Sequence, residues 1–271
     1  MQSPGGSEGT QQEGAATAYA LPFRFLYTPW PHLSLGKPAV LDVVLKREPA
    51  EPATSNLDSL VTTFYMLAST GALSGDAVHP AESNVGHPSR PERDRSTLQW
   101  RFPSTNIAQA AIPILAQLLM LATSEVEIER AVLTCQGSSA PIRLAENPAL
   151  RDWYPAIWEN LSFDLSLSGE IGKSAMLGIT ASRLLSEEDQ QRIEVELLTW
   201  VTATQIGAYG VAPIAPDRCG IFSDRHVTFL GSDLELSFFN IRCHPAAFRG
   251  LVNVCTKIAE SIVPLTTVVL E

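Results

Sequence analysis

The residue types best suited to metal binding or nucleophilic catalysis gather late in the chain, in and after the stretch PDRCGIFSDRHVTF at residues 216–229. They are Cys219, Asp224, His226, Cys243 and His244. Zinc accepts thiolate, imidazole and carboxylate ligands, and a thiol beside an imidazole can act as a nucleophile. Their spacing matches no metal-site pattern, and adjacent residues of an extended backbone point to opposite faces. We therefore predict no metal site and no catalytic residue here, with Cys219 as a packed thiol and His226 as a hydrogen-bonded loop or strand residue.

The motifs that mark common enzyme sites are also missing from the expected positions. The sequence has no GxxxxGK[ST] loop, no GxGxxG after a strand, and no GxSxG elbow between a strand and a helix. HExxH and CxxC pairs, which often hold zinc, do not occur. We therefore expect a non-enzymatic protein without a cofactor.

Acidic side chains cluster in SEEDQQRIEVE, residues 186–196. Glu187 and Glu188 fall in the first turn of a predicted helix, where the helix dipole stabilises negative charge. Glu194 and Glu196 lie beyond that turn, and we interpret them as part of an acidic face for a basic partner. The predicted partner-binding residues of this stretch are Glu187, Glu188 and Glu194. Acid–base catalysis by such carboxylates would need burial to separate their pKa values, which an exposed helix start does not offer.

Two long predicted loops, at residues 79–95 and 216–229, carry arginine beside acidic residues. Long loops on a rigid scaffold often hold binding residues, and the planar guanidinium group suits protein recognition. The alternative is that these loops are exposed to solvent and have no binding role. The predicted partner-binding residues in these loops are Arg93, Arg95, Asp217, Arg218, Asp224 and Arg225.

A third candidate surface is the aromatic stretch RDWYPAIWENL, residues 151–161. Large aromatic side chains this close together are unlike a solvated connector. Either they hold two parts of the protein together, or Trp153 and Trp158 form part of a docking surface, since tryptophan is enriched at interface hot spots.

Charge and composition narrow the class of protein. The chain has 29 acidic and 19 basic side chains, a net charge of −10, which disfavours nucleic acid and anionic membranes and favours a basic protein partner. The most apolar stretch, residues 110–122, is shorter than the ~18 residues of a membrane span. The N-terminal residues lack the basic leader and apolar segment of a secretory signal, so we expect a cytoplasmic protein with reduced cysteines.

Two stretches of the chain match at a constant offset of 136 residues. LQWRFPSTNIAQAAIPIL begins at Leu98 and LELSFFNIRCHPAAFRGL at Leu234. The same offset aligns AVLDVVLKR at residues 39–47 with AMLGITASR at residues 175–183, without a gap. We interpret the chain as a duplicated module.

Each copy has the pattern strand, helix, strand, helix, strand. The first helices are predicted to begin with capping boxes, Ser55 with Asp58 and Ser186 with Asp189, and to end near left-handed glycines, Gly71 and Gly207. The second helices are predicted at residues 106–123 and 245–261, and the strands at residues 39–47, 98–102, 127–134, 175–183, 234–239 and 264–270, with earlier strands at 23–27 and 161–167.

This pattern predicts an α+β protein of two tandem, pseudo-symmetric β-α-β-α-β repeats, ferredoxin-like or related, with helices packed on sheet. The predicted organisation is a flexible tail at residues 1–20, a first repeat at 21–135, an aromatic-rich connector at 136–160 and a second repeat at 161–271.

In size, acidity, lack of catalytic motifs and long arginine-bearing loops, the chain loosely resembles the α+β immunity proteins with which bacteria neutralise secreted toxins, including polymorphic and type VI toxins. The resemblance lies in overall character, so no family residue is carried over. It implies a toxin inhibitor that covers the basic active site of a partner such as a nuclease-like toxin.

The alternative is an enzyme or small-ligand binder with its site between the two repeats, because ligand sites favour domain interfaces. Trp153, Trp158, Cys219 and His226 are then the residues of interest. A structural subunit of a larger assembly is a further alternative. The sequence leaves open whether the chain forms homo-oligomers and whether one repeat or both carry the binding face.

Overall fold

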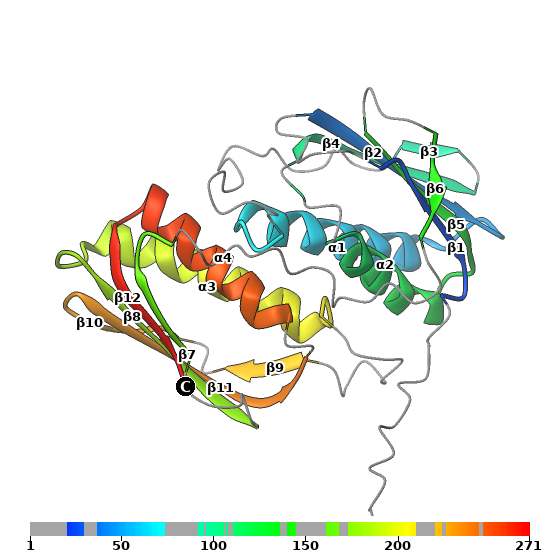
Figure 1. Ribbon diagram of the computed structural model, residues 1–271. Coiled ribbons are helices and arrows are strands. Elements are labelled where there is room, and N and C mark those ends of the chain that lie inside the picture. The colour runs from blue at the N-terminus through cyan, green and yellow to red at the C-terminus, as the bar shows by residue number, and fades with distance from the viewer. Residues whose placement is uncertain are drawn as a thin grey trace, which may run out of the picture.

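Two sheets form the outer layers of the protein, and two pairs of helices lie between them (Figure 1). The computed structural model describes residues 21–29, 37–73, 92–94, 96–105, 107, 111–135, 140–144, 161–167, 173–209, 220–223, 226–243 and 246–271. Within these residues the chain is a mixed α+β structure with two six-stranded sheets and four α-helices.

The first half of the chain forms one sheet and the helices α1 (Glu51–Ser69) and α2 (Ile112–Leu121), which cover one face of it (Figure 1). Its strands are β1 (Arg24–Tyr27), β2 (Lys37–Leu45), β3 (Glu92–Asp94), β4 (Thr97–Thr105), β5 (Ile128–Cys135) and β6 (Ile142–Arg143). Their order in the sheet is β3-β4-β2-β5-β1-β6. Strand β1 runs parallel to β5, and the other neighbours are antiparallel.

The second half forms the other sheet and the helices α3 (Glu187–Ile206) and α4 (Ala246–Ser261). Its strands are β7 (Asp164–Leu167), β8 (Ser174–Ala181), β9 (Gly220–Ser223), β10 (Thr228–Leu230), β11 (Asp233–Arg242) and β12 (Leu265–Leu270). Their order is β10-β11-β8-β12-β7, and β9 also pairs with β11. Strand β7 runs parallel to β12, and the other pairs are antiparallel.

The two halves have the same order of main strands, β4-β2-β5-β1 and β11-β8-β12-β7, with the parallel pair at the same place. Helices α1 and α3 begin at residues 51 and 187, and strands β4 and β11 at residues 97 and 233, so both pairs keep the offset of 136. The first strands, β1 and β7, begin at residues 24 and 164 and do not keep it. The main order in each half is β-β-α-β-α-β, whereas a ferredoxin-like unit is β-α-β-β-α-β, so ferredoxin-like repeats are not confirmed.

The predicted loops at residues 79–95 and 216–229 are wrong in part. Strand β3 lies in the first and pairs with β4, while β9 and β10 lie in the second and pair with β11. Strand β6, in the stretch expected as a connector, is an outer strand of the first sheet. These strands have two to four residues each, too few to show the alternation of apolar and polar residues that identifies a strand in a sequence. They form because they pair with a neighbouring strand.

The first helix of the second half starts as predicted, whereas the first helix of the first half does not. Ser186 and Asp189 form the predicted capping box at the start of α3. Helix α1 instead begins at Glu51, after Ala50 and with a proline in its first positions, because proline is pre-set for a helix start. Ser55 therefore lies within the helix, and Asp58 accepts a hydrogen bond of 2.8 Å from the indole of Trp100.

Left-handed glycines follow both helices, as predicted. Gly207 has φ 109° at the end of α3, and Gly71 has φ 81° just after α1. Glycine adopts this conformation without the penalty that a side chain incurs, so each helix stops there.

The core lies between each sheet and its helices, and Phe102 and Phe238, which the 136-residue offset matches, are both buried. Tyr65 of α1 stacks on Phe102 of β4, with ring centroids 5.6 Å apart. Trp200 of α3 meets Phe238 of β11 edge-on, also at 5.6 Å. Each half is therefore held by an aromatic contact between its long helix and an equivalent strand phenylalanine. Among the described residues, no helix combines the length and apolar character needed to cross a bilayer.

Candidate functional site

Three of the predicted partner-binding residues, Glu187, Glu188 and Glu194, lie on α3. Arg93 lies in β3, where the backbone alone is described. The other predicted partner-binding residues lie outside the described residues: Arg95, Trp153, Trp158, Asp217, Arg218, Asp224 and Arg225.

The residues considered for metal binding or nucleophilic chemistry do not form a site within the described part of the chain. Cys219, Asp224 and His244 lie outside it, and His226 is exposed. Burial raises the pKa of the Cys243 thiol to about 12, so this cysteine is protonated at neutral pH and is a weak nucleophile. Among the described residues, no three His, Cys, Asp or Glu side chains group as metal ligands would.

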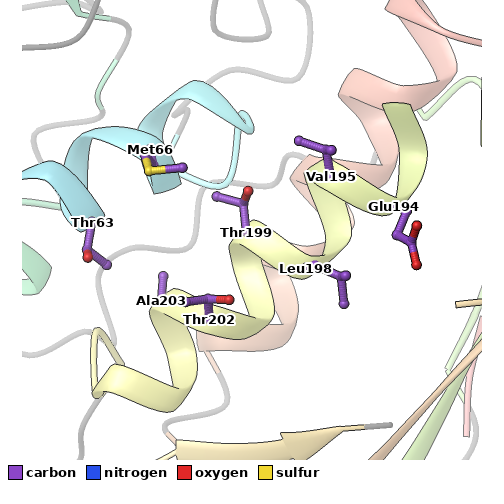
Figure 2. A pocket seen from close by; sticks show the side chains of 8 residues that line it. All are labelled: Thr63, Met66, Glu194, Val195, Leu198, Thr199, Thr202 and Ala203. Carbon is purple, nitrogen blue, oxygen red and sulfur yellow. The ribbon is translucent and has the colours of Figure 1, made fainter. Parts of the chain in front are cut away.

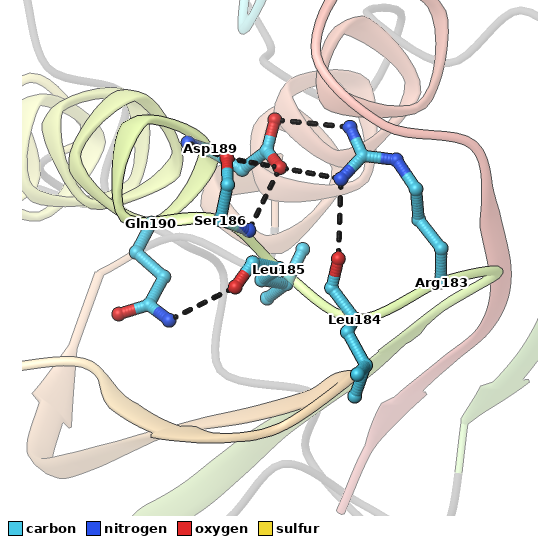
Figure 3. Close-up of polar contacts among 6 residues, drawn as sticks. All are labelled: Arg183, Leu184, Leu185, Ser186, Asp189 and Gln190. Atoms are coloured by element: carbon cyan, nitrogen blue, oxygen red, sulfur yellow. Dashed lines mark hydrogen bonds and ion pairs between the residues drawn. The ribbon is translucent and has the colours of Figure 1, made fainter.

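Asp189 is held by interactions within the second half and is not available to a partner (Figure 3). Its carboxylate accepts hydrogen bonds from the backbone and hydroxyl of Ser186, at 3.0 and 2.7 Å. The guanidinium group of Arg183 donates to both carboxylate oxygens, at 2.6 and 3.2 Å. These hydrogen bonds from Arg183 and Ser186 hold the pKa of Asp189 well below its ordinary value. The start of α3 therefore leaves Glu187 and Glu188 as its exposed acids.

The side of α3 that faces away from its sheet carries acidic and aliphatic side chains, which we call the α3 face: Glu187, Glu188, Glu194, Val195 and Leu198. Residues three, four and seven apart lie on one side of a helix. Val195 is 64% exposed, although aliphatic residues of a helix normally face the core. Arg192 is the single basic residue of α3, and its guanidinium group donates to the carbonyl of Ser261 at 2.9 Å. The α3 face is therefore acidic and partly apolar.

A groove of ≈ 340 Å³ runs along this face where α3 meets α1 (Figure 2). Helix α1 contributes Thr63 and Met66, and Met66 is 41% exposed. Figure 2 shows Thr63 toward the Ala203 end of α3 and Met66 toward the end with Thr199 and Val195, so α1 and α3 run antiparallel here. The α3 residues that line the groove are Glu194, Val195, Leu198, Thr199, Thr202 and Ala203. We call this feature the α1–α3 groove.

Lys257 of α4 fixes the spacing of the two helices that form the groove. Its ammonium group donates to the carboxylate of Glu196 on α3 and to the carbonyl of Ser69 at the end of α1, each at 2.6 Å. The lysine side chain is 6% exposed and the glutamate side chain 19%. A cation at a helix C-terminus is also favoured by the helix dipole. The interpretation of Glu196 as part of an acidic face is therefore wrong, because its charge is used inside the protein.

The α1–α3 groove could not be read from one stretch of sequence, because its walls come from different halves of the chain. One signal did exist. Val195 and Leu198 fall three residues apart on the side of α3 opposite to the buried Ile193, Leu197 and Trp200. Aliphatic residues on the solvent side of a predicted amphipathic helix indicate a contact beyond its own sheet.

Comparisons with known proteins give this chain no family. No protein-family model matches the sequence, and no curated protein matches it. Among solved structures, a mutant of the ferredoxin protease FusC in complex with Arabidopsis ferredoxin is 9% identical, with a TM-score of 0.20, over 87% of this chain and 36% of that chain. A Cas6 product complex is 12% identical, with a TM-score of 0.16, over 87% of this chain and 99% of that chain. The chain thus spans about a third of the FusC chain, and likenesses at these scores carry no argument.

Proposed function

We propose that this chain is a non-enzymatic module that binds a basic protein partner on the α3 face. The observation that carries the proposal is the composition of that face, with three glutamates beside the exposed Val195 and the half-buried Leu198. Charge complementarity speeds association and discriminates against wrong partners, while buried apolar contacts supply affinity. The net charge of −10 makes the electrostatic potential around the protein negative as well, which attracts a basic partner.

Within this class, we propose an immunity protein, which acts in the bacterial cytoplasm by covering the basic active site of a secreted toxin. The loose resemblance of the sequence to immunity proteins supports this choice. A nuclease-like toxin fits best, because a surface that binds phosphates is basic. Inhibition then needs no catalysis by this chain, since occupancy of the toxin site is sufficient.

We also propose that the two halves derive from a duplicated unit. The equal order and direction of the main strands and the offset of 136 residues support the duplication. A relation of that unit to ferredoxin-like folds would require a rearranged strand order.

The test is an affinity pull-down from a bacterial lysate at low and then moderate salt, with mass spectrometry of the retained proteins. Three forms are compared: the wild type, a variant with Glu187, Glu188 and Glu194 each changed to Lys, and a control with the exposed strand residues Glu129, Asp164 and Glu235 each changed to Lys. Both variants change the net charge equally. We expect one basic protein to be retained by the wild type and the control, to be released as salt rises, and to be lost from the α3 variant.

Two outcomes of this pull-down would reject the proposal. One is equal retention of the basic protein by the α3 variant and the wild type. The other is the absence of any basic protein that the wild type retains in a salt-dependent way.

The second candidate function is small-ligand binding between the halves, which the α1–α3 groove favours. Its volume of ≈ 340 Å³ lies in the range of ligand sites, and one carboxylate, of Glu194, accompanies its mainly apolar lining. Native mass spectrometry of the purified protein tests it. A bound small molecule that is absent from a Val195→Arg variant would favour this function over partner binding.

A further inference from the structure

We propose that the α1–α3 groove receives an amphipathic α-helix of the basic partner. Apolar side chains of that helix fill the groove, and its lysine or arginine side chains lie beside Glu187 and Glu188. This inference rests on the proposed function and names the kind of segment that the partner presents.

The groove favours a helix over an extended segment because of how its walls are built. Both walls are α-helices, whose backbone N–H and C=O groups are bonded within each helix. An extended segment buried there would leave its own backbone groups without partners, at a cost for each group. Extended peptides usually bind at the free edge of a sheet, which supplies those partners. A helix satisfies its own backbone and needs only side-chain contacts.

The dimensions of the groove also suit a helix. Its α3 wall runs from Glu194 to Ala203, which is about 13 Å of helix, or roughly two and a half turns. Two packed helices leave a notch above their line of contact, in which the side-chain ridges of a third helix can lie. Met66 on one wall and Val195 on the other are both exposed, so apolar anchors spaced three or four residues apart would cover them.

The charges of the α3 face set the direction in which the partner helix extends. Glu187 and Glu188 lie about 10 Å from Glu194 toward the start of α3, beyond the end of the groove. A helix that fills the groove and reaches these glutamates is about sixteen residues long. It therefore carries its apolar anchors in one half and its basic residues in the other.

The groove is held in shape before any partner arrives. The contacts of Lys257 with Glu196 and Ser69 tie α3 to the end of α1. Asn253, one turn earlier on α4, donates to the carbonyl of Ala72, just after α1, at 3.4 Å. A preformed site loses less conformational freedom on binding and so binds more tightly.

The test uses synthetic peptides as probes with the full chain. The first peptide, of about sixteen residues, is helix-forming, with leucines three and four apart in one half and lysines in the other. The second has the same composition with leucines and lysines intermixed, and the third has a central proline that prevents a continuous helix. Fluorescence anisotropy gives each Kd, and circular dichroism reports helix formation on binding.

We expect the first peptide to bind at least about tenfold more tightly than the other two and to gain helicity when it binds. A Val195→Arg variant should weaken its binding by about tenfold or more, because a charge then occupies the groove. Both Val195 and Met66 are exposed, so Val195→Arg and Met66→Arg should fold as the wild type does. Reversal of Glu187 and Glu188 should weaken binding in a salt-dependent way.

Three results would overturn the inference. The proline peptide could bind as tightly as the helical one, or Val195→Arg could leave binding unchanged. Light scattering could instead show a dimer of this chain that Val195→Arg makes monomeric, which would assign the groove to a second copy. If retention of the partner in the pull-down still depends on Glu187, Glu188 and Glu194, either of the first two results rejects only the proposal that the partner presents a helix. Failure of that dependence rejects the protein-binding function itself.

Discussion

At the start of α3, the carboxylate of Asp189 accepts hydrogen bonds from both Ser186 and Arg183. These bonds lower its pKa in the folded state from the ordinary 3.8. Folding therefore favours the ionised form, and the stability from this group is present above about pH 4 and is lost as the pH falls below it. The first turn of α3 thus contains one carboxylate that is bound by other residues, Asp189, and two that are exposed, Glu187 and Glu188.

The first prediction concerns Asp189→Asn. We expect the variant to be less stable than the wild type at about pH 7, with a difference that narrows as the pH falls below about 4, because Asp189 of the unfolded wild type then takes up a proton that the folded state does not. Urea denaturation at several pH values measures the free energies of unfolding. Glu187→Gln, at an exposed position of the same turn, is the control and should show a small difference. A difference for Asp189→Asn that does not change with pH would contradict the prediction.

The second prediction concerns Gly250, on the buried side of α4. A methyl group there would collide with the hydroxyl of Tyr209 and lie 3.4 Å from the carbonyl of Ala72. Although alanine favours helix over glycine by about 1 kcal/mol, we expect Gly250→Ala to lower stability by about 1–3 kcal/mol through overpacking. Tyr209→Phe should relieve part of this loss, which a double-mutant cycle in urea would measure. A stabilised Gly250→Ala would show that α4 can shift. Gly178→Ala is the control, because its added atom would be 3.9 Å from the nearest neighbour.

At the scale of elements, hydrophobic periodicity was sufficient to place the main strands and all four helices. It failed for β3, β6, β9 and β10, which are short and depend on pairing with a neighbour. The predicted start of the second helix in the first half, residue 106, lies outside the described residues, and α2 begins at Ile112. Proline at residue 113 lies in the first turn of that helix, where the missing N–H is tolerated.

The candidate site was predictable only where its residues share one element. The glutamates of the α3 face follow from a run of charge in the sequence. The α1–α3 groove requires two helices more than a hundred residues apart to meet, and local patterns carry no information on that contact. The use of Glu196 was misread for the same reason, because its partner is Lys257 of another helix.

The third prediction compares the two predicted capping residues. Ser186→Ala should lower stability by about 1 kcal/mol, because the N–H of Asp189 loses its acceptor. Ser55→Ala should be neutral or slightly stabilising, because Ser55 is exposed within α1 and alanine favours helix. Thermal or urea denaturation measures both. Equal losses for the two variants would indicate that α1 starts at Ser55 in solution.

At the scale of the whole molecule, the helices lie between the two sheets, and in the described part of the chain α1 and α3 carry a contact between the halves (Figure 1). Lys257 is the polar centre of that contact, since it reaches α3 of its own half and the end of α1 in the other. The halves should therefore unfold together as one cooperative unit, and the contact should weaken when Lys257 loses either partner.

The fourth prediction tests this with Lys257→Met, Glu196→Leu and the double variant. A buried ion left without its partner is destabilising by about 3–5 kcal/mol, so each single variant should lose stability. Lys257→Met is the clearer case, because both Glu196 and the carbonyl of Ser69 then lose their donor. The double variant should recover part of the loss, since no unpaired charge remains. Recovery stays incomplete because the carbonyl of Ser69 still lacks its donor.

The matched control is Lys46→Met, which breaks an exposed ion pair of 3.7 Å with Glu127 and should cost at most about 1 kcal/mol. Calorimetry reports whether the halves still melt together, and urea denaturation gives the four free energies of unfolding. If the losses of the single variants simply add in the double variant, the pair is not coupled. If Lys257→Met leaves the stability and the joint melting of the halves unchanged, its contact with Ser69 does not hold the halves together, and apolar packing and the hydrogen bond from Asn253 must set the spacing of α1 and α3.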